Sequence, residues 1–409
     1  MLQGLLHRDD EVLPARRLGM FELDEEAAEL ERRHEDVIRL TLGKSELPVH
    51  TEITQAMVAA LADERRSGLV HPLGLPELRS AIAEYESRAR AMPVDPASVV
   101  VSVGSSLIFR NLCSLLCRPS TGEAAGEILI PRPYDSLYLY SAALAGAKVR
   151  TYDIDPFTGV IDTGSLAAAI GGATRAVVIC SPGNPLGNVL TAEDLERIDA
   201  EVDGRAVIIS DEICRNMSFD GPVASLGSLA APRSPVIVTS AFSKGFRMYA
   251  RRVGYAVMPA RYVRALSIVQ DHTLLTTDPV AQFGALEALR HLDEIESLRA
   301  LYKTRRDYAM EKLSAASAVR PIRPSGGFYL TADVSELLRP GESDRSLARV
   351  ILAVTHVATV PGSDFGLPGT LRLSFSASQF EMAVDRLARY FADGRASPPG
   401  AVPHPATLV

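Results

Sequence analysis

The sequence contains few lysines. It has 409 residues and 43 basic side chains, yet lysine occurs only at positions 44, 148, 244, 303 and 312, and the other basic residues are arginines. Such a bias is typical of a GC-rich genome, and it draws attention to each lysine that remains. Lys244 stands out because it follows an apolar run, in the stretch TSAFSKGFRMYARRVGYAVMP (239–259).

Signals for a membrane or for secretion are also missing. No apolar run approaches the ~20 residues that a membrane-spanning helix needs, and the first residues, MLQGLLHRDDEV, show no signal-peptide pattern. The four cysteines, Cys113, Cys117, Cys180 and Cys214, have neither zinc-binding nor redox spacing. We therefore expect a reduced, cytoplasmic protein with no membrane partner.

The charge and the glycine pattern exclude two further classes. The formal net charge is −7, whereas nucleic-acid-binding proteins usually carry a basic surface, so we expect no nucleic-acid partner. The chain has no glycine-rich dinucleotide fingerprint and no internal repeat. Its hydrophobic content of 47% and charged content of 23% are those of an ordinary globular protein.

From about residue 98 onward, short β-branched apolar runs alternate with helical patterns. Continuous apolarity in short strands indicates burial on both faces, which is typical of a mostly parallel α/β sheet. The runs are SVVVSV (98–103), EILI (127–130), AVVIC (176–180), AVIIS (206–210), VIVTS (236–240) and VGYAVM (253–258).

The pattern changes after about residue 285. A long charged helix is predicted over 288–316, strands over 326–334 and 370–376, and a last helix over 378–392. At this length two lobes are expected. We assign 1–50 to an N-terminal arm and part of a small domain, 51–284 to a large domain, 285–393 to a small α+β domain and 394–409 to a disordered tail.

Polar or small residues follow several of the apolar runs. Each has an ordinary explanation by itself, such as helix capping or a turn. In open α/β sheets, however, ligands bind beyond the carboxyl ends of the strands. The residues in question are Gly104–Ser106, Tyr134, Asn184, Asp211 and Lys244.

This set matches the needs of pyridoxal 5′-phosphate (PLP). Its phosphate suits helix N–H groups and a guanidinium. Its ring needs a stacking partner, its pyridine nitrogen a carboxylate, and its aldehyde a lysine that forms a Schiff base. The sequence therefore predicts a PLP site at one edge of the sheet.

The chain resembles the class I/II aminotransferases of PLP fold type I over about residues 35–390. The matching segments are VIRLTLGKSELP, GLPELRSAIAEY, VGSS, PRPYDSLY, SPGNPLG, SDEI, SAFSKGFRMYARRVGY, PSGGFYL, VPGSDFG and LRLSFS. The resemblance implies a large domain with a mostly parallel seven-stranded sheet flanked by helices, and a smaller α+β domain. It also implies a homodimer with active sites near the subunit interface.

Roles for individual residues come from this resemblance. Lys244 would form the Schiff base with PLP and then carry the α-proton of the substrate. Asp211 would keep the pyridine nitrogen protonated, and Asn184 would donate a hydrogen bond to the phenolic oxygen. The implied cofactor-binding residues are Gly104, Ser105, Ser106, Tyr134, Asn184, Asp211, Ser243, Lys244 and Arg252.

The substrate would be a free amino acid. Arg372 would bind its α-carboxylate as a two-pronged donor, helped by the backbone near Gly43. Asn184 would lie beside the substrate, and Glu46 at the mouth of the site could pair with a guanidinium. Glu46 could equally be an exposed loop charge.

The residue that stacks on the ring is ambiguous. Counted back from Ala145-Gly146, the aromatic position of the family falls on Asp135. Tyr134 fits with a shift of one residue, and Tyr138 is the alternative. We assign the stacking role to Tyr134.

Other departures from the family concern the reaction. Cys214 replaces the usual tyrosine of the DEIY motif, and a thiol is a weak hydrogen-bond donor. It either alters the chemistry of the Schiff base or simply packs. The tyrosine that commonly precedes GLPELR is missing, and His71 could replace it or be structural.

Transamination is the main expectation. The alternative is elimination or cyclisation of an arginine-derived (hydroxyarginine) substrate in antibiotic biosynthesis, because the segment SEL (45–47) faintly resembles capreomycidine-synthase-like enzymes. A protein that keeps the fold but has lost catalysis is a third hypothesis. The presence of Lys244, Asp211, Asn184, Arg252 and Arg372 together argues against it.

Overall fold

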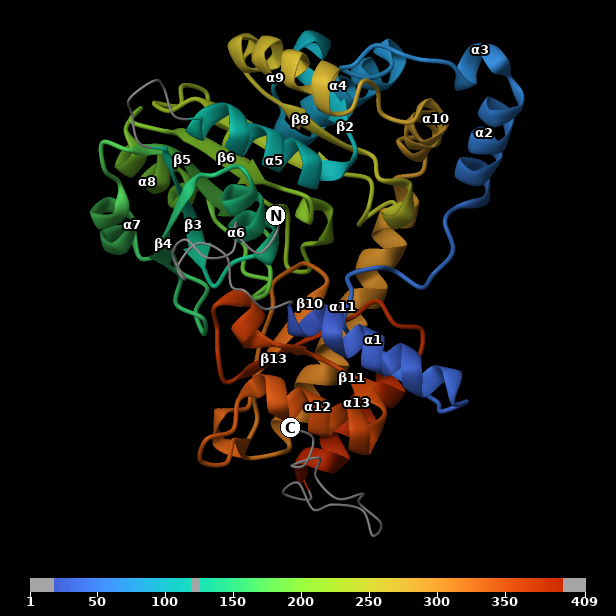
Figure 1. Cartoon of the computed structure of the whole chain (residues 1–409), viewed down its shortest axis with the longest axis vertical. Helices are drawn as coiled ribbons and strands as arrows, with labels where there is room; N and C mark the ends of the chain where they lie inside the picture. Colours follow the sequence, from blue (N-terminus) through green and yellow to red (C-terminus); the bar gives the residue numbers. More distant parts are fainter. Residues whose placement is uncertain (1–17, 119–124, 393–409) are drawn as a thin grey trace, which may run out of the picture.

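The computed structural model describes residues 18–118 and 125–392. The tail expected over 394–409 lies outside the described residues, as do the first 17 residues of the expected N-terminal arm. The chain forms two lobes, drawn in the upper and lower halves of Figure 1.

The upper lobe is built on a seven-stranded sheet with the order β2-β8-β7-β6-β5-β3-β4 (Figure 1). Within this sheet β8 runs antiparallel to both of its neighbours, and the other pairs are parallel. The predicted mostly parallel sheet is confirmed. Its strands are β2 (Val99–Ser102), β3 (Glu127–Arg132), β4 (Lys148–Asp153), β5 (Thr174–Cys180), β6 (Val207–Asp211), β7 (Val236–Ala241) and β8 (Gly254–Val257).

Helices cover both faces of this sheet, which explains why the strands are apolar throughout. Ile128 and Ile130 of β3 pack with one helical layer, whereas Leu129 between them packs with the other. The first layer consists of α5 (Gly104–Cys117), α6 (Ser136–Leu144) and α9 (Ala260–Thr273). The second includes α7 (Thr163–Ala169) and α8 (Ala192–Val202).

The seventh strand, β4, did not appear among the apolar runs. It lies at the edge of the sheet and pairs only with β3. Most of its side chains are half-buried or exposed, so its sequence, KVRTYD, carries no continuous apolar pattern.

The lower lobe combines the two ends of the described chain. Its antiparallel sheet has the order β12-β13-β10-β9, and β1 (Ile38–Arg39) pairs in parallel with β11 (Val357–Ala358). The strands are β9 (Arg320–Ile322), β10 (Tyr329–Asp333), β12 (Val360–Pro361) and β13 (Thr370–Ser374). Its helices are α1 (Gly19–Arg32), α12 (Asp344–Thr355) and α13 (Phe380–Ala392).

The long helix predicted over 288–316 begins later than predicted. Helix α10 (Pro279–Ala288) ends where the prediction began, and α11 (Asp293–Ser314) starts after a short turn. Asp293, Glu294 and Glu296 occupy the first turn of α11, where acidic side chains stabilise a helix N-terminus. Helix α11 then runs from the upper lobe into the lower one (Figure 1).

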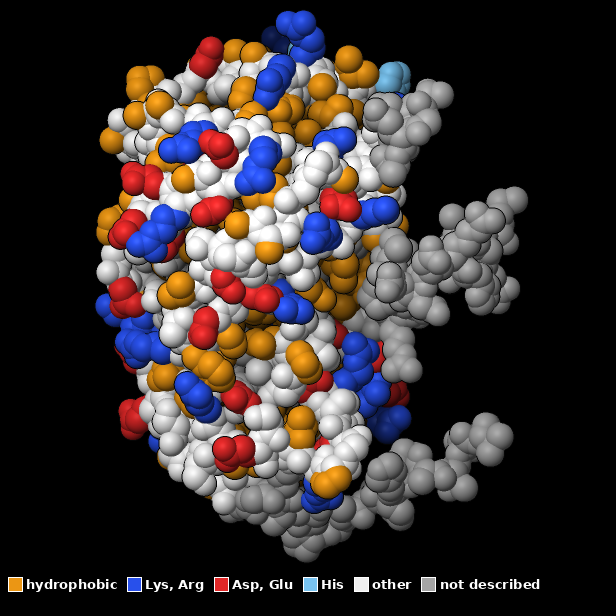
Figure 2. Space-filling view, turned by 90° about the vertical axis from the view of Figure 1, so that its left-hand side faces the viewer, with side chains coloured by type: hydrophobic (Ala, Val, Ile, Leu, Met, Phe, Trp, Pro, Cys, Tyr) orange, Lys and Arg blue, Asp and Glu red, His pale blue; other side chains and the backbone are white. Residues whose placement is uncertain are grey.

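The remaining helices lie beside α10, on the side of the upper lobe away from α7 and α8 (Figure 1). They are α2 (Thr51–Ala62), α3 (Glu64–Ser67) and α4 (Pro76–Arg90). Figure 2 shows the opposite side, where acidic and basic side chains are interspersed. Within residues 18–118 and 125–392, no helix has both the length and the apolar character needed to span a membrane.

Candidate active site

A cavity of about 510 Å³ lies between the two lobes, at the carboxyl ends of β6 and β7. Tyr329, Phe365 and Arg372 of the lower lobe also line it. Most of the residues selected from the sequence meet in this one cavity. They are Gly43, Ser105, Ser106, Asn184, Asp211, Ser243, Lys244, Arg252 and Arg372.

Lys244 follows β7 and reaches across to the other lobe. Its Nζ donates hydrogen bonds to the carbonyl oxygen of Gly43 at 2.9 Å and to the hydroxyl of Tyr329 at 3.1 Å. A Cβ atom on Gly43 would collide with both the amine and the hydroxyl. A side chain at position 43 would therefore displace the amine and the hydroxyl from their present contact.

An anion site lies at the N-terminus of α5. The first turn presents Ser105 and Ser106, with backbone N–H groups that have no partner within the helix. Arg252 approaches so closely that a Cβ on Gly104 would lie 2.7 Å from its Nη2. Its Nη1 donates to the carbonyl of Tyr249 at 2.9 Å. Hydroxyls, amides and a guanidinium converge here, which suits a phosphate.

Asp211 ends β6 and is buried, with 6% of its surface exposed. Burial raises the pKa of its carboxyl to about 6, although the hydrogen bond from Tyr138 opposes this shift. The Tyr138 hydroxyl donates to Oδ2 at 2.7 Å, and the Ile213 N–H donates to Oδ1 at 3.2 Å. A carboxylate held this way stabilises a positive charge placed beside it.

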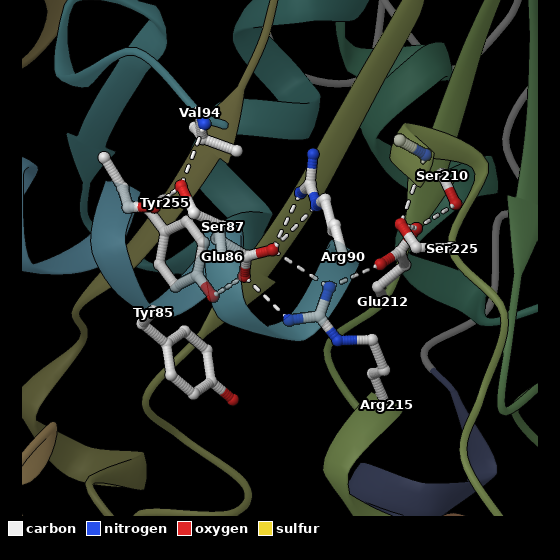
Figure 3. Close-up of polar contacts among 12 residues, drawn as sticks. Tyr85, Glu86, Ser87, Arg90, Val94, Ser210, Glu212, Arg215, Ser225 and Tyr255 are labelled. Atoms are coloured by element: carbon white, nitrogen blue, oxygen red, sulfur yellow. Dashed lines mark hydrogen bonds and ion pairs between the residues drawn. The ribbon is translucent and has the colours of Figure 1, made fainter. Parts of the chain in front are cut away.

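A buried charge network supports the segment after β6 (Figure 3). Arg215 forms ion pairs with Glu212 at 2.8 Å and with Glu86 of α4 at 2.9 Å. Glu86 also pairs with Arg90 at 2.8 Å and accepts a hydrogen bond from Tyr255 of β8. The network connects the end of β6 to α4 and β8, and it thereby holds the carboxylate of Asp211 in place.

Arg372 of β13 is held from several sides. Its Nη1 donates to Asn184 Oδ1 at 3.0 Å, and its Nη2 donates to the carbonyl of Thr41 at 2.7 Å. The guanidinium lies between two rings, 4.0 Å from the centroid of Tyr329 and 4.4 Å from that of Phe365. These contacts fix the orientation of the guanidinium group in the cavity wall.

Arg372 nevertheless forms no ion pair within the described part of the chain. Only 3% of its surface is exposed, its hydrogen-bond acceptors are two neutral oxygens and the sulfur of Met20, and its Nε has no hydrogen-bond partner. Burial lowers the pKa of the guanidinium, although the nearby Tyr329, Asp135 and Asp364 oppose this shift. Because a buried charge is costly unless it is paired, the site is built to receive an anion such as a carboxylate.

The structure does not bring Tyr134 to the cavity. Its side chain packs beside Gly366, where a Cβ would lie 2.8 Å from its ring. The alternative, Tyr138, lines the cavity, but its hydroxyl binds Asp211. Asp135, to which residue counting assigned the aromatic position of the family, lines the cavity as well.

Two other residues considered from the sequence lie elsewhere. Glu46 is exposed and accepts a hydrogen bond from the N–H of Ser378 at 2.6 Å, so its carboxylate fixes a turn outside the cavity. His71 is exposed, and its Nδ1 accepts from the N–H of Leu73 at 3.1 Å. Neither side chain lines the cavity of this chain.

Cys214 does line the cavity. Burial raises the pKa of its thiol to about 12, while the nearby Lys244 lowers it. The thiol is therefore neutral at physiological pH. All four cysteines are free and buried.

Tyr329, Phe365 and Met20 are among the lining residues that received no role from the sequence. The first two belong to the segments PSGGFYL and VPGSDFG, which matched the family, so a signal was available. Met20, in α1, contacts Arg372 through its sulfur, 3.6 Å from Nη2, and no motif marked it.

Comparison with known proteins supports the same assignment. Residues 35–391 match the family model for aminotransferase class I and II. The aspartate/prephenate aminotransferase of Thermus thermophilus is 32% identical over 396 residues, which cover 95% of this chain and 99% of that protein. The aspartate aminotransferase of Bacillus sp. YM-2 is 30% identical over 373 residues, 89% of this chain and 94% of that protein.

Solved structures share the whole fold. The aspartate aminotransferase of Thermus thermophilus with maleate superposes with a TM-score of 0.84 at 29% identity, over 93% of this chain and 99% of that one. The alanine aminotransferase of Pyrococcus furiosus gives 0.85 at 27% identity, over 94% and 100%. These relatives do not favour the elimination or cyclisation alternative, and Glu46, which was to bind its guanidinium, lies outside the cavity.

The residues present also fit PLP itself. The cavity combines helix N–H groups beside a guanidinium, a lysine amine, a buried carboxylate and an amide side chain, and a side chain at position 104 would meet the guanidinium of Arg252. The family match and the geometry agree. The chain belongs to the class I and II aminotransferase family and is a PLP-dependent aminotransferase.

Proposed function

We propose that this enzyme moves the α-amino group of a free L-amino acid to a 2-oxo acid, with Arg372 binding the α-carboxylate of each. The unpaired Arg372 carries this proposal. A buried guanidinium that forms no ion pair among the described residues faces the same cavity as the amine of Lys244. An α-carboxylate is the anion that amino-acid and 2-oxo-acid substrates share.

The other residues hold the cofactor and move a proton. When bound, PLP supplies the aldehyde that combines with amino groups and the ring that withdraws electrons. Lys244 would hold the cofactor through its amine and would accept and return the α-proton of the substrate. Asp211 would hold a proton on the ring nitrogen, and Asn184 would donate to the phenolic oxygen. The residues that would bind the phosphate are Gly104, Ser105, Ser106, Ser243 and Arg252.

The walls of the cavity favour a substrate with a neutral side chain. Its described cations are Lys244, Arg252 and Arg372, and each already has a role in this proposal. Much of the remaining wall is apolar, with Leu18, Met20, Phe21, Leu42 and Phe365 among its residues. We therefore expect amino donors with apolar or aromatic side chains to react faster than aspartate or glutamate.

We further propose a cytoplasmic homodimer. Apolar side chains are exposed on and beyond α2, with exposures of 62% for Val58, 68% for Leu61 and 77% for Leu69. A second copy would cover them, and the free, buried cysteines suit a reducing compartment. Sedimentation of Leu61→Asp tests the interface, because a charge there should shift the protein toward the monomer.

The amino transfer is tested in half reactions. The purified PLP enzyme is mixed with single L-amino acids, and conversion of the cofactor to its pyridoxamine form is followed by absorbance; a 2-oxo acid should reverse it. Arg372→Lys should raise KM for the amino acid at least tenfold, because a bidentate contact is lost. If arginine or hydroxyarginine alone reacts and no amino group is transferred, the proposal fails.

A further inference from the structure

Asp135 places a carboxylate in the cavity, at the position to which residue counting from Ala145-Gly146 assigns the aromatic ring of the family. It lies between β3 and α6. Its Oδ1 accepts the N–H of Leu137 at 2.9 Å and so caps α6. Its Oδ2 is not needed for the cap and accepts the Nδ2 of Asn184 at 2.7 Å.

Asn184 is thereby held at both ends of its amide. Its oxygen accepts from Arg372 at 3.0 Å, and its nitrogen donates to Asp135. A flipped amide would place its NH₂ group against a guanidinium and its oxygen against a carboxylate, so one orientation is fixed. An NH₂ group has two N–H bonds, and the second remains for another acceptor in the cavity.

Asp135 also places a negative charge inside the site. Its field raises the pKa of Asp211 and that of Cys214, although burial is the largest cause of both shifts. An aromatic ring at this position would contribute stacking but no charge. The cofactor site of this chain therefore has a different electrostatic balance from one lined by a ring.

We propose that Asp135 is a positioning residue of the cofactor site, which fixes the Asn184 amide as a hydrogen-bond donor and stabilises the protonated linkage between Lys244 and PLP. The inference rests on PLP binding but not on the identity of the amino acid. A negative charge near a protonated nitrogen raises the pH at which the proton is lost. Removal of the carboxylate should therefore lower that pH.

The test uses the holoenzyme and three variants. Asp135→Asn keeps the size of the side chain and removes its charge. Asp135→Ser keeps a helix cap but is too short to reach Asn184. Asp162→Asn is the matched control, because Asp162 caps α7 through the N–H of Ser165 at 3.0 Å and does not line the cavity. The measurements are the pH midpoint of the visible absorbance change, the Kd for PLP and the melting temperature of the PLP-free protein.

We expect both Asp135 variants to lower the pH midpoint by about one unit, because the loss of a neighbouring charge outweighs the opposite effect of a lost neutral hydrogen bond. We also expect them to weaken PLP binding about tenfold, because the Asn184 donor is no longer oriented. The control should change only the melting temperature. Unchanged midpoints in both variants would overturn the inference and reduce Asp135 to a helix cap. A wild-type protein that binds no PLP would instead overturn the cofactor assignment, and this inference with it.

Discussion

The amine of Lys244 and the hydroxyl of Tyr329 belong to different lobes and lie 3.1 Å apart. This contact joins the segment after β7 to β10 of the lower lobe, and the same amine also donates to the carbonyl of Gly43 at 2.9 Å. The position of the lysine therefore depends on how the two lobes meet.

Tyr329→Phe should slow amino transfer with little loss of amino-acid binding. The variant removes the hydrogen bond that orients the amine but keeps the ring that packs on Arg372. We expect kcat to fall about tenfold while KM changes less than threefold, as for the loss of one oriented hydrogen bond. Steady-state kinetics measure both, and a change confined to KM would contradict this role.

Asp211→Asn should change the pH dependence of stability in the PLP-free protein. The folded pKa is raised from 3.8 to about 6, so the contribution of this group to stability is fully present below pH 3.8 and is lost as the pH rises through about 6. The loss amounts to about 3 kcal/mol at neutral pH. Asparagine does not titrate.

Melting curves of both proteins between pH 4 and 7.5 provide the check. The melting temperature of Asp211→Asn relative to wild type should rise across this range, because only the wild type acquires a buried charge. Parallel curves would show that the pKa of Asp211 is not raised. In the presence of PLP the variant should bind the cofactor more weakly.

Cys214→Tyr should alter the holoenzyme spectrum. The thiol is neutral and a weak donor, whereas a phenol at this position reaches farther and donates more strongly. The added hydrogen bond should shift the pH midpoint of the visible band by about one unit downward, because it favours the deprotonated linkage. Cys214→Ala is the comparison, and equal midpoints in all three proteins would mean that Cys214 only packs.

Glu86→Gln should strongly destabilise the fold. The variant leaves Arg90 and Arg215 with one fewer buried partner charge, and such losses cost about 3–5 kcal/mol. Glu84→Gln on the same helix is the control, because its ion pair with Arg88 is exposed. Denaturant unfolding should give a clearly lower midpoint for Glu86→Gln than for Glu84→Gln. Equal midpoints would show that the network in Figure 3 contributes no net stability.

The parallel sheet could be predicted from sequence because its inner strands are buried on both faces. Edge strand β4 could not, since exposed Lys148 and Arg150 interrupt its apolar pattern. The break before α11 was missed because both sides of it have helical composition. Boundaries of this kind depend on the packing of each segment, which short-range patterns do not record.

The cavity residues at strand ends were predictable for a similar reason: parallel strands bring their carboxyl ends to one edge. Tyr134 illustrates the limit of this reasoning. A shift of one residue turns a side chain in another direction, and residue counting could not decide between Tyr134, Asp135 and Tyr138. Glu46 was close in sequence to Gly43, yet its carboxylate is bound by the backbone of Ser378 outside the cavity.

The central claim is that Lys244 is the residue to which PLP attaches. The direct test is to titrate PLP into the purified wild type, Lys244→Ala and Lys148→Ala. The last variant is the control, because Lys148 is an exposed lysine of β4. We expect a visible absorbance band and amino transfer in the wild type and in Lys148→Ala, and neither in Lys244→Ala. A band and amino transfer that persist in Lys244→Ala would contradict it.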